Sequence, residues 1–239
     1  MWTRRAVLAL AVFAGCSLQV QAGALPEGFV YLRDVVPDIH QDMRYASRRN
    51  FMRRRLPGYG AGECVLTQAA ARALGKIQNA AVASGYSLVV FDCYRPQGAV
   101  DAMVAWVRQG KGTDPDYYPN VPRSELIRQG YIGAKSSHAR GSTVDVALDL
   151  LDEQEAGSKQ VCRRRDRGTV DFGTPFDCFD PASRTDSRAV SERAREYRNT
   201  LVGLMRKGGF RNYPGEWWHF TLEDEPFPNR SFGFAITPR

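Results

Sequence analysis

The sequence predicts a single α+β domain in which helices pack on a mostly antiparallel sheet. Residues 67–85 and 191–208 repeat apolar side chains at helical spacing, whereas residues 86–92 and 144–148 have the short apolar or alternating patterns of strands. With 239 residues, 43% of them hydrophobic, the chain can bury one substantial core. No internal repeat or linker divides it, so one domain is expected over residues 23–239.

The first 22 residues have the pattern of an export signal. Arg4 and Arg5 form a short positive region, residues 6–14 an apolar core, and residues 20–22 (Val-Gln-Ala) a small-residue cleavage site. The apolar stretch is much shorter than the ~20 residues of a membrane-spanning helix. We therefore predict an exported, periplasmic protein without a transmembrane span.

Cys16 offers an alternative to this cleavage. Residues 13–16 (Phe-Ala-Gly-Cys) resemble a bacterial lipobox, in which Cys16 would become the lipidated first residue. That motif usually has Leu where this sequence has Phe13. Cleavage after Ala22 is therefore favoured, with a lipid anchor at Cys16 as the alternative.

Four further cysteines remain in the exported chain: Cys64, Cys93, Cys162 and Cys178. An even number predicts two disulfides, for which three pairings exist. We favour Cys162–Cys178, which closes an Arg-rich loop, with Cys64–Cys93 as the second, although the sequence does not exclude the other pairings. None of the four has the C-x-x-C spacing of zinc-binding cysteines.

The chain is basic. Its formal net charge of +7 falls to +5 without the first 22 residues, and arginines cluster at residues 48–49, 53–55 and 163–165. No nucleic-acid-binding motif accompanies these clusters, so nucleic acid is not an expected partner. Solvated loops, or attraction to an anionic cell wall or membrane, explain them with fewer assumptions.

The first half of the domain predicts two helices with a buried strand between them. After a Gly- and Arg-rich loop over residues 50–63, Thr67 is expected to cap a helix that ends at Gly85. A buried strand over residues 86–92 follows. Pro96 suits the first turn of the next helix, because its missing amide has no partner there in any case.

The second half predicts shorter elements around a long loop. We expect a short helix over residues 124–129 and a half-buried strand over residues 144–148, in which Asp145 lies on the face opposite the valines. Residues 152–186 form a polar, loop-rich excursion of the kind that often covers a site. The remaining expected elements are a helix capped by Ser191 and stopped by Gly208, and a strand over residues 217–222.

Two histidines and two carboxylates predict a metal site. His138 precedes Asp145 by seven residues, and His219 follows Glu216 by three. Gly141 permits a turn that folds His138 back over Asp145. A turn before Glu216 frees its side chain from strand alternation. We predict His138, Asp145 and His219 as ligands, a water in the open fourth position, and Glu216 as general base on that water.

Arg95 ends a buried strand, where an arginine needs a carboxylate or a substrate to contact. Peptide hydrolysis passes through a tetrahedral intermediate with negative charge, which a fixed guanidinium stabilises. The alternative is a structural ion pair with Asp92. The residues alone leave both interpretations open.

The metal motifs resemble those of a known family. Residues 136–145 resemble the Ser-x-His-x-x-Gly-x-Ala-x-Asp motif, and residues 216–219 the Glu-x-x-His motif, of D-alanyl-D-alanine dipeptidases, the VanX-like zinc peptidases (subfamily D of the M15 peptidases) known from vancomycin resistance. Further similar stretches follow in order along nearly the whole chain after the export signal: residues 44–51, 92–96, 117–120, 173–177 and 224–229.

This resemblance implies the zinc D-Ala-D-Ala peptidase fold and hydrolysis of D-Ala-D-Ala to two D-alanines. It implies one Zn²⁺ per chain on the three predicted ligands, with Glu216 as catalytic base and Arg95 as transition-state stabiliser. It also implies that Asp177 holds the free amino group of the substrate, with Ser137 and Tyr59 close to the dipeptide.

The sequence departs from the family pattern at several points. Thr143 stands where the motif usually has Ala, and Cys93 replaces the usual Gly of an Asp-Gly-Tyr-Arg-Pro stretch. The Arg-rich segment around Cys162 looks like an insertion, which could reshape the substrate entrance. The export signal is unlike the cytoplasmic resistance enzymes and favours a periplasmic role in recycling wall-derived D-Ala-D-Ala.

Two other functions remain alternatives. One is a zinc D,D-carboxypeptidase that trims longer peptidoglycan peptides, and Asp177 argues against it because only a dipeptidase must bind an amine next to the scissile bond. The other is a non-catalytic, zinc-stabilised wall-binding module. Glu216 and Arg95 argue against this module, because a binding site needs no spare base beside its metal.

Overall fold

The computed structural model describes residues 24–151 and 161–239. The predicted export signal and Cys16 lie outside these ranges. Among the described helices, none is both long enough and apolar enough to span a membrane.

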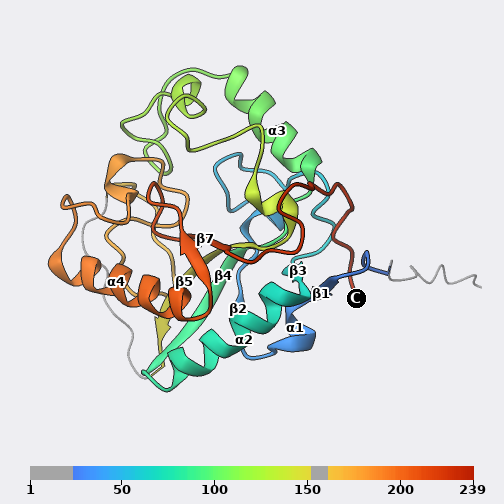
Figure 1. The fold of residues 1–239 in the computed structure, drawn as a ribbon. Helices are drawn as coiled ribbons and strands as arrows, with labels where there is room; N and C mark the ends of the chain where they lie inside the picture. Colours follow the sequence, from blue (N-terminus) through green and yellow to red (C-terminus); the bar gives the residue numbers. More distant parts are fainter. Residues whose placement is uncertain (1–23, 152–160) are drawn as a thin grey trace, which may run out of the picture.

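A five-stranded sheet runs through the middle of the molecule (Figure 1). Its strands, in spatial order, are β2 (His40–Gln41), β4 (Tyr86–Asp92), β5 (Thr143–Leu150), β7 (His219–Leu222) and β6 (Phe210–Asn212). The β2–β4 pair is parallel, and the other three pairs are antiparallel. The predicted α+β fold with a mostly antiparallel sheet is therefore confirmed.

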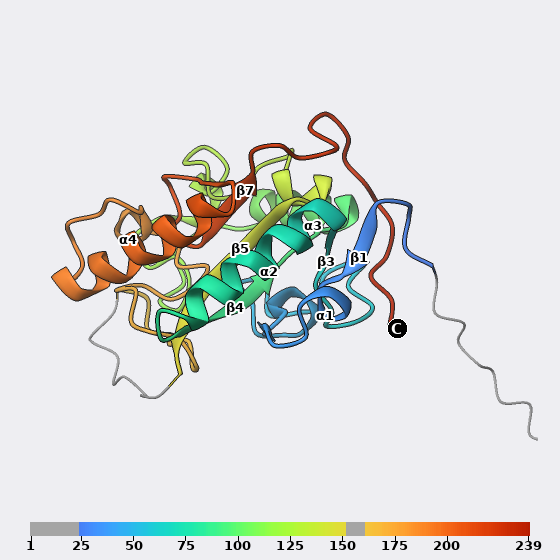
Figure 2. The same cartoon turned by 60° about the horizontal axis from the view of Figure 1, so that its bottom comes forward.

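Two helices pack against this sheet and against each other. α2 (Gln68–Val82) and α4 (Glu192–Lys207) lie side by side on it (Figures 1 and 2), whereas α3 (Gln97–Arg108) lies apart from both in Figure 1. The predicted caps of α2 and α4 are confirmed, since the side chains of Thr67 and Ser191 accept hydrogen bonds from backbone amides three residues on. Pro96 is the N-cap of α3 rather than a residue of its first turn.

The remaining regular elements are short. β1 (Phe29–Tyr31) pairs antiparallel with β3 (Val65–Thr67), and α1 (Leu32–Val35) follows β1. Four 3₁₀ turns complete the described elements: η1 (Arg44–Ala46), η2 (Arg123–Glu125), η3 (Ser137–Arg140) and η4 (Pro181–Ser183). The helix predicted over residues 124–129 is wrong in type, because only η2 forms there before the chain turns at Gly130.

The prediction that β5 is half-buried is also wrong. Residues Thr143 to Leu148 are buried on both faces: α4 packs against this central strand, and the face that carries Asp145 is covered by other parts of the chain. Asp145 is 2% exposed even though its alternation with valines is typical of a solvent-facing side chain. A buried carboxylate in a central strand needs charged or hydrogen-bonding partners, which directs attention to its surroundings.

Two disulfides join the loops to this framework. Cys64 is bonded to Cys93, and Cys162 to Cys178, so the favoured pairing is confirmed. The first disulfide links the start of β3 to the end of β4. The second lies in the loop-rich excursion, where η4 is the regular element in the described part, residues 161–186.

Candidate active site

Strand register brings three polar side chains to one face of the sheet. Asp145 on β5 is the partner of Asp92 on β4 and of His219 on β7. Residues directly opposite one another in an antiparallel pair point to the same face. The three side chains therefore lie side by side across three neighbouring strands.

His138 reaches this group from η3, just before β5. Gly141 ends η3 with a φ of 84°, the left-handed conformation that folds the chain back into β5. The His138 Nδ1–H donates to the carbonyl oxygen of Cys93 at 2.7 Å. This hydrogen bond fixes the tautomer and turns Nε2 toward Asp145.

The two histidines and Asp145 present three donor atoms in a nearly equilateral triangle. His138 Nε2 lies 3.2 Å from Asp145 Oδ1 and 3.3 Å from His219 Nδ1, and His219 Nδ1 lies 3.1 Å from Asp145 Oδ1. A tetrahedral Zn²⁺ with bonds of about 2.0 Å separates its ligand atoms by about 3.3 Å. The predicted ligands thus form a group that can hold a metal ion, and their chemistry fits zinc.

Electrostatics also favour a cation at this triangle. Burial favours the neutral form of Asp145, but His138 and His219 outweigh it and hold the pKa of Asp145 below its usual value. Burial lowers the pKa of His219. An ionised carboxylate beside a neutral imidazole is the protonation state that metal binding requires.

Glu216 lies beside the triangle without belonging to it. Its amide donates to the Tyr213 carbonyl in the turn before β7, and its Oε2 is 3.7 Å from His219 Nδ1. The side-chain amide of Asn212 on β6 donates to the carbonyls of both Glu216 and His219. Burial, together with repulsion from nearby carboxylates, raises the pKa of Glu216 well above its usual value.

Arg95 combines the two interpretations that the sequence left open. Its Nε donates to Asp92 at 2.9 Å, which is the structural ion pair, and a terminal nitrogen lies 3.5 Å from Asp145 Oδ2. The guanidinium carbon also lies 4.9 Å from the centre of the Tyr45 ring. Arg95 is therefore fixed in place and still lines the cavity described next.

A cavity of about 330 Å³ unites these groups. Its volume is at the small end of the range for ligand pockets. The lining includes all the predicted metal, base and arginine residues together with Asp177 and Ser137. Tyr59 is not part of the lining, since it is buried with its hydroxyl donating to Asp92 at 2.6 Å.

Asp177 is a buried residue of the cavity lining. It is 3% exposed, and the Tyr45 hydroxyl contacts both carboxylate oxygens, at 3.0 and 3.1 Å. Burial, with repulsion from Asp145, raises the pKa of Asp177 to about 8. A buried carboxylate with a raised pKa is stabilised when a cation arrives beside it.

Ser137 contacts the predicted ligand His219. Its Oγ is 3.1 Å from His219 Nε2, so it accepts the proton of the tautomer that leaves Nδ1 free. Ser137 also lines the cavity, and a ligand there remains within its reach.

Comparison with known proteins identifies the family. The family model described as D-ala-D-ala dipeptidase, of the M15 peptidases, matches residues 26–237. The chain belongs to this family. It is 36% identical over 215 residues to a D-alanyl-D-alanine dipeptidase of Enterococcus faecalis, covering 89% of this chain and 100% of the relative.

Other D-alanyl-D-alanine dipeptidases of the family are similarly close. One from Streptomyces coelicolor is 36% identical over 210 residues (87% of this chain, 98% of the relative), and one from Escherichia coli is 31% identical over 194 residues (81% and 83%). Membership of this peptidase family makes the protein a hydrolytic enzyme. It confirms the resemblance that the two motifs predicted.

Three contributors to the site were not identified from the sequence. Tyr45 was noted within a similar stretch, but its contact with Asp177 spans 132 residues. The side-chain amide of Asn212 donates to backbone carbonyls, and the backbone carbonyl of Cys93 accepts from the His138 ring. A sequence does not reveal contacts of this kind. Tyr45, in contrast, lies in a stretch that resembles the family, and this position could have marked it as a candidate site residue.

Proposed function

We propose that this protein is a zinc-dependent D-Ala-D-Ala dipeptidase. The observation that carries the proposal is one small cavity that holds a metal-donor triangle, a separate carboxylate at Glu216 and a buried carboxylate at Asp177. The names of the relatives support the same substrate. A wall-binding module would need neither the separate carboxylate nor the arginine beside it.

The zinc site would consist of His138, Asp145 and His219. When bound, Zn²⁺ supplies a Lewis acid that polarises the scissile carbonyl and lowers the pKa of a water molecule. The hydrogen bonds of His138 to the Cys93 carbonyl and of His219 to Ser137 hold both imidazoles in the required tautomer.

Glu216 acts as general base. Its carboxylate accepts a proton from the attacking water as the new C–O bond forms, and returns a proton to the leaving nitrogen as the C–N bond breaks. Burial raises the pKa of Glu216 above its usual value, which makes its carboxylate a stronger proton acceptor. Arg95, fixed by Asp92, stabilises the negative charge that develops on the carbonyl oxygen.

Asp177 binds the ammonium group of the substrate. The buried carboxylate, hydrogen-bonded by Tyr45, gains a charge-assisted partner when the dipeptide enters. An N-acylated peptide brings no charge and additional bulk to this buried position. The free dipeptide is therefore the preferred substrate over longer wall peptides.

The enzyme acts after export, in the periplasm. The export signal supports this location, and so do the two disulfides, which form and persist in oxidising compartments. Recycling of D-Ala-D-Ala released from the cell wall is the role that suits such a location.

The test is an assay of D-alanine release from D-Ala-D-Ala by the purified, zinc-loaded protein. We expect turnover that a chelator abolishes and added Zn²⁺ restores, because the donor triangle is the only group of three such side chains close enough to hold a metal among the described residues. The matched substrate is N-acetyl-D-Ala-D-Ala, which should react far more slowly. Absence of dipeptide cleavage with zinc bound would contradict the proposal, and faster cleavage of the acylated form would favour a carboxypeptidase.

A further inference from the structure

A short segment of the excursion holds the backbone on one side of Asp177. The Phe176 amide donates to Asp166 Oδ2 at 2.6 Å, and the Phe176 carbonyl accepts a hydrogen bond from Arg164. Arg164 and Asp166 also pair with each other at 2.6 Å. Both backbone groups of the residue before Asp177 are therefore bound by one ion pair.

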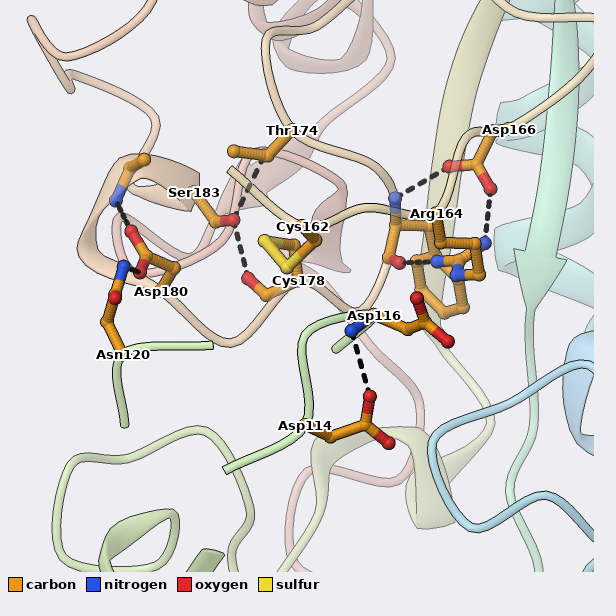
Figure 3. Close-up of a disulfide and its surroundings, with 12 residues drawn as sticks. Asp114, Asp116, Asn120, Cys162, Arg164, Asp166, Thr174, Cys178, Asp180 and Ser183 are labelled. Carbon is orange, nitrogen blue, oxygen red and sulfur yellow. Dashed lines mark hydrogen bonds and ion pairs between the residues drawn. A yellow bond between two sulfur atoms is a disulfide. The ribbon is translucent and has the colours of Figure 1, made fainter. Parts of the chain in front are cut away.

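The same segment holds the other side of Asp177 covalently. Cys178, the next residue, is joined to Cys162, two residues before Arg164. Figure 3 shows this disulfide beside the Arg164–Asp166 pair. The Ser183 hydroxyl donates to the Cys178 carbonyl at 2.6 Å and restrains it further.

Asp166 also reaches the hydrogen-bonding partner of Asp177. It pairs with Arg44 at 2.9 Å, and Arg44 directly precedes Tyr45, whose hydroxyl contacts Asp177. The side chains of Asp166 and Arg44 are 5% and 4% exposed, so this ion pair is shielded from water. Asp166 thus connects the backbone next to Asp177 with the side chain of the residue next to Tyr45.

The conformation of Asp177 explains why such restraint is needed. Its φ is 60°, in the left-handed region that is unfavourable for a residue other than glycine. A residue persists in this conformation only where its neighbours determine it. The restraints named above act on the two residues that flank the unfavourable φ, Phe176 and Cys178.

We propose that Cys162, Arg164 and Asp166 form a clamp that positions the Asp177 carboxylate for the amino group of the substrate, with Asp166 as its central residue. This inference rests on the proposed function. The three are positioning residues, since they act through Phe176, Cys178 and Arg44 rather than by touching the substrate.

A second ion pair of Arg44 makes it possible to test whether Asp166 positions Asp177 or only neutralises the charge of Arg44. Arg44 also pairs with Asp42 at 2.7 Å, so its charge has a partner without Asp166. Asp42 and Asp166 therefore contact the same guanidinium, but of these two only Asp166 also bonds the Phe176 amide. The chain itself thus offers a matched control.

The experiment compares D166N with D42N and with the double variant C162S/C178S. For each folded protein, kcat and KM are measured with D-Ala-D-Ala, together with the inhibition constant of propionyl-D-alanine, which lacks only the amino group. We expect KM to rise on the order of tenfold in D166N and C162S/C178S, with kcat and the inhibition constant within about twofold of wild type. D42N should behave as wild type.

A purely structural role would give a different result. The clamp is contradicted if KM stays within about twofold of wild type in both clamp variants, if KM and the inhibition constant rise together, or if D42N matches D166N. The double variant keeps the test decisive should D166N not fold. Failure of the wild-type protein to cleave D-Ala-D-Ala would instead contradict the proposed function.

Discussion

The two ends of the candidate site are held in different ways. The metal-donor end depends on regular strands, because Asp145 and His219 are register partners in the central sheet. The amino-group end depends on a loop, because Asp177 lies outside any strand, with a φ of 60° and a disulfide at the next residue. Two of the three proposed metal ligands are thus built into the sheet, and the carboxylate proposed to bind the substrate amine is held by cross-links in a loop.

Because of this difference, substitutions at the two ends should have different effects on catalysis. Shifting Asp145 or His219 requires disruption of hydrogen bonds between central strands, which form part of the cooperative core. Shifting Asp177 requires only the loss of local restraints in a loop. We therefore expect changes at the sheet end to reduce kcat and changes at the loop end to raise KM.

Glu216→Gln tests the sheet end and should have the largest effect. It removes the proton acceptor while preserving the size of the side chain, so kcat should fall about 10²- to 10⁴-fold. Zinc content, measured by elemental analysis, should remain one per chain because Glu216 is outside the donor triangle. The matched control is the exposed Glu223→Gln. Turnover close to wild type in E216Q would remove the proposed base.

Asp177→Asn tests the loop end and should have an intermediate effect. A charge-assisted hydrogen bond contributes about 1.5–3 kcal/mol, so kcat/KM for D-Ala-D-Ala should fall about 10- to 100-fold, mainly through KM. The preference for the free dipeptide over N-acetyl-D-Ala-D-Ala should shrink by a similar factor. An unchanged preference would show that the amine is recognised elsewhere.

Asp166→Asn should have the smallest effect, a loss of stability that is present at neutral pH and disappears in acid. Burial favours the neutral form of Asp166, but Arg164, Arg44 and the Phe176 amide outweigh it and hold the pKa of Asp166 below its usual value. Because the folded pKa is lowered, this stabilisation is present above the unfolded pKa of about 3.9 and is lost as the pH falls through the folded value. D166N should therefore be less stable than wild type by about 2 kcal/mol at neutral pH.

Urea unfolding of wild type and D166N across the acid range measures this difference. It should decrease steadily as the pH is lowered, since the variant has no carboxyl group to protonate at this position. A difference that does not change with pH would mean that shape, rather than charge, determines the contribution of Asp166.

The sequence predicted most of the sheet end. The two motifs carry their ligands within a few residues of Gly141 and the Pro214–Gly215 turn, and local turn chemistry is enough to bring each pair together. The caps of α2 and α4 were predicted for the same reason, because capping depends on a side chain and an amide three residues away. Burial of β5 on both faces was missed, because alternation alone does not report what covers the second face of a strand.

The loop end was predictable only in part. The Cys162–Cys178 pairing was favoured from the loop it closes, but contacts of Asp166 with Arg44 and Phe176 join residues from separate segments of the chain. Nothing in the local sequence distinguishes such an aspartate from one that is solvated. Backbone amides and carbonyls, which are identical in every residue type except proline, are common partners here, and a sequence cannot show which of them is used.

The position of the second disulfide has a consequence for when the enzyme becomes effective. A newly synthesised chain in the reducing cytoplasm carries Cys162 and Cys178 as free thiols. If the clamp depends on their bond and the chain is exported as proposed, the precursor would bind dipeptide weakly until it has crossed the membrane and been oxidised. Oxidation would then act as a maturation step, which spares dipeptide inside the cell and commits hydrolysis to the compartment outside.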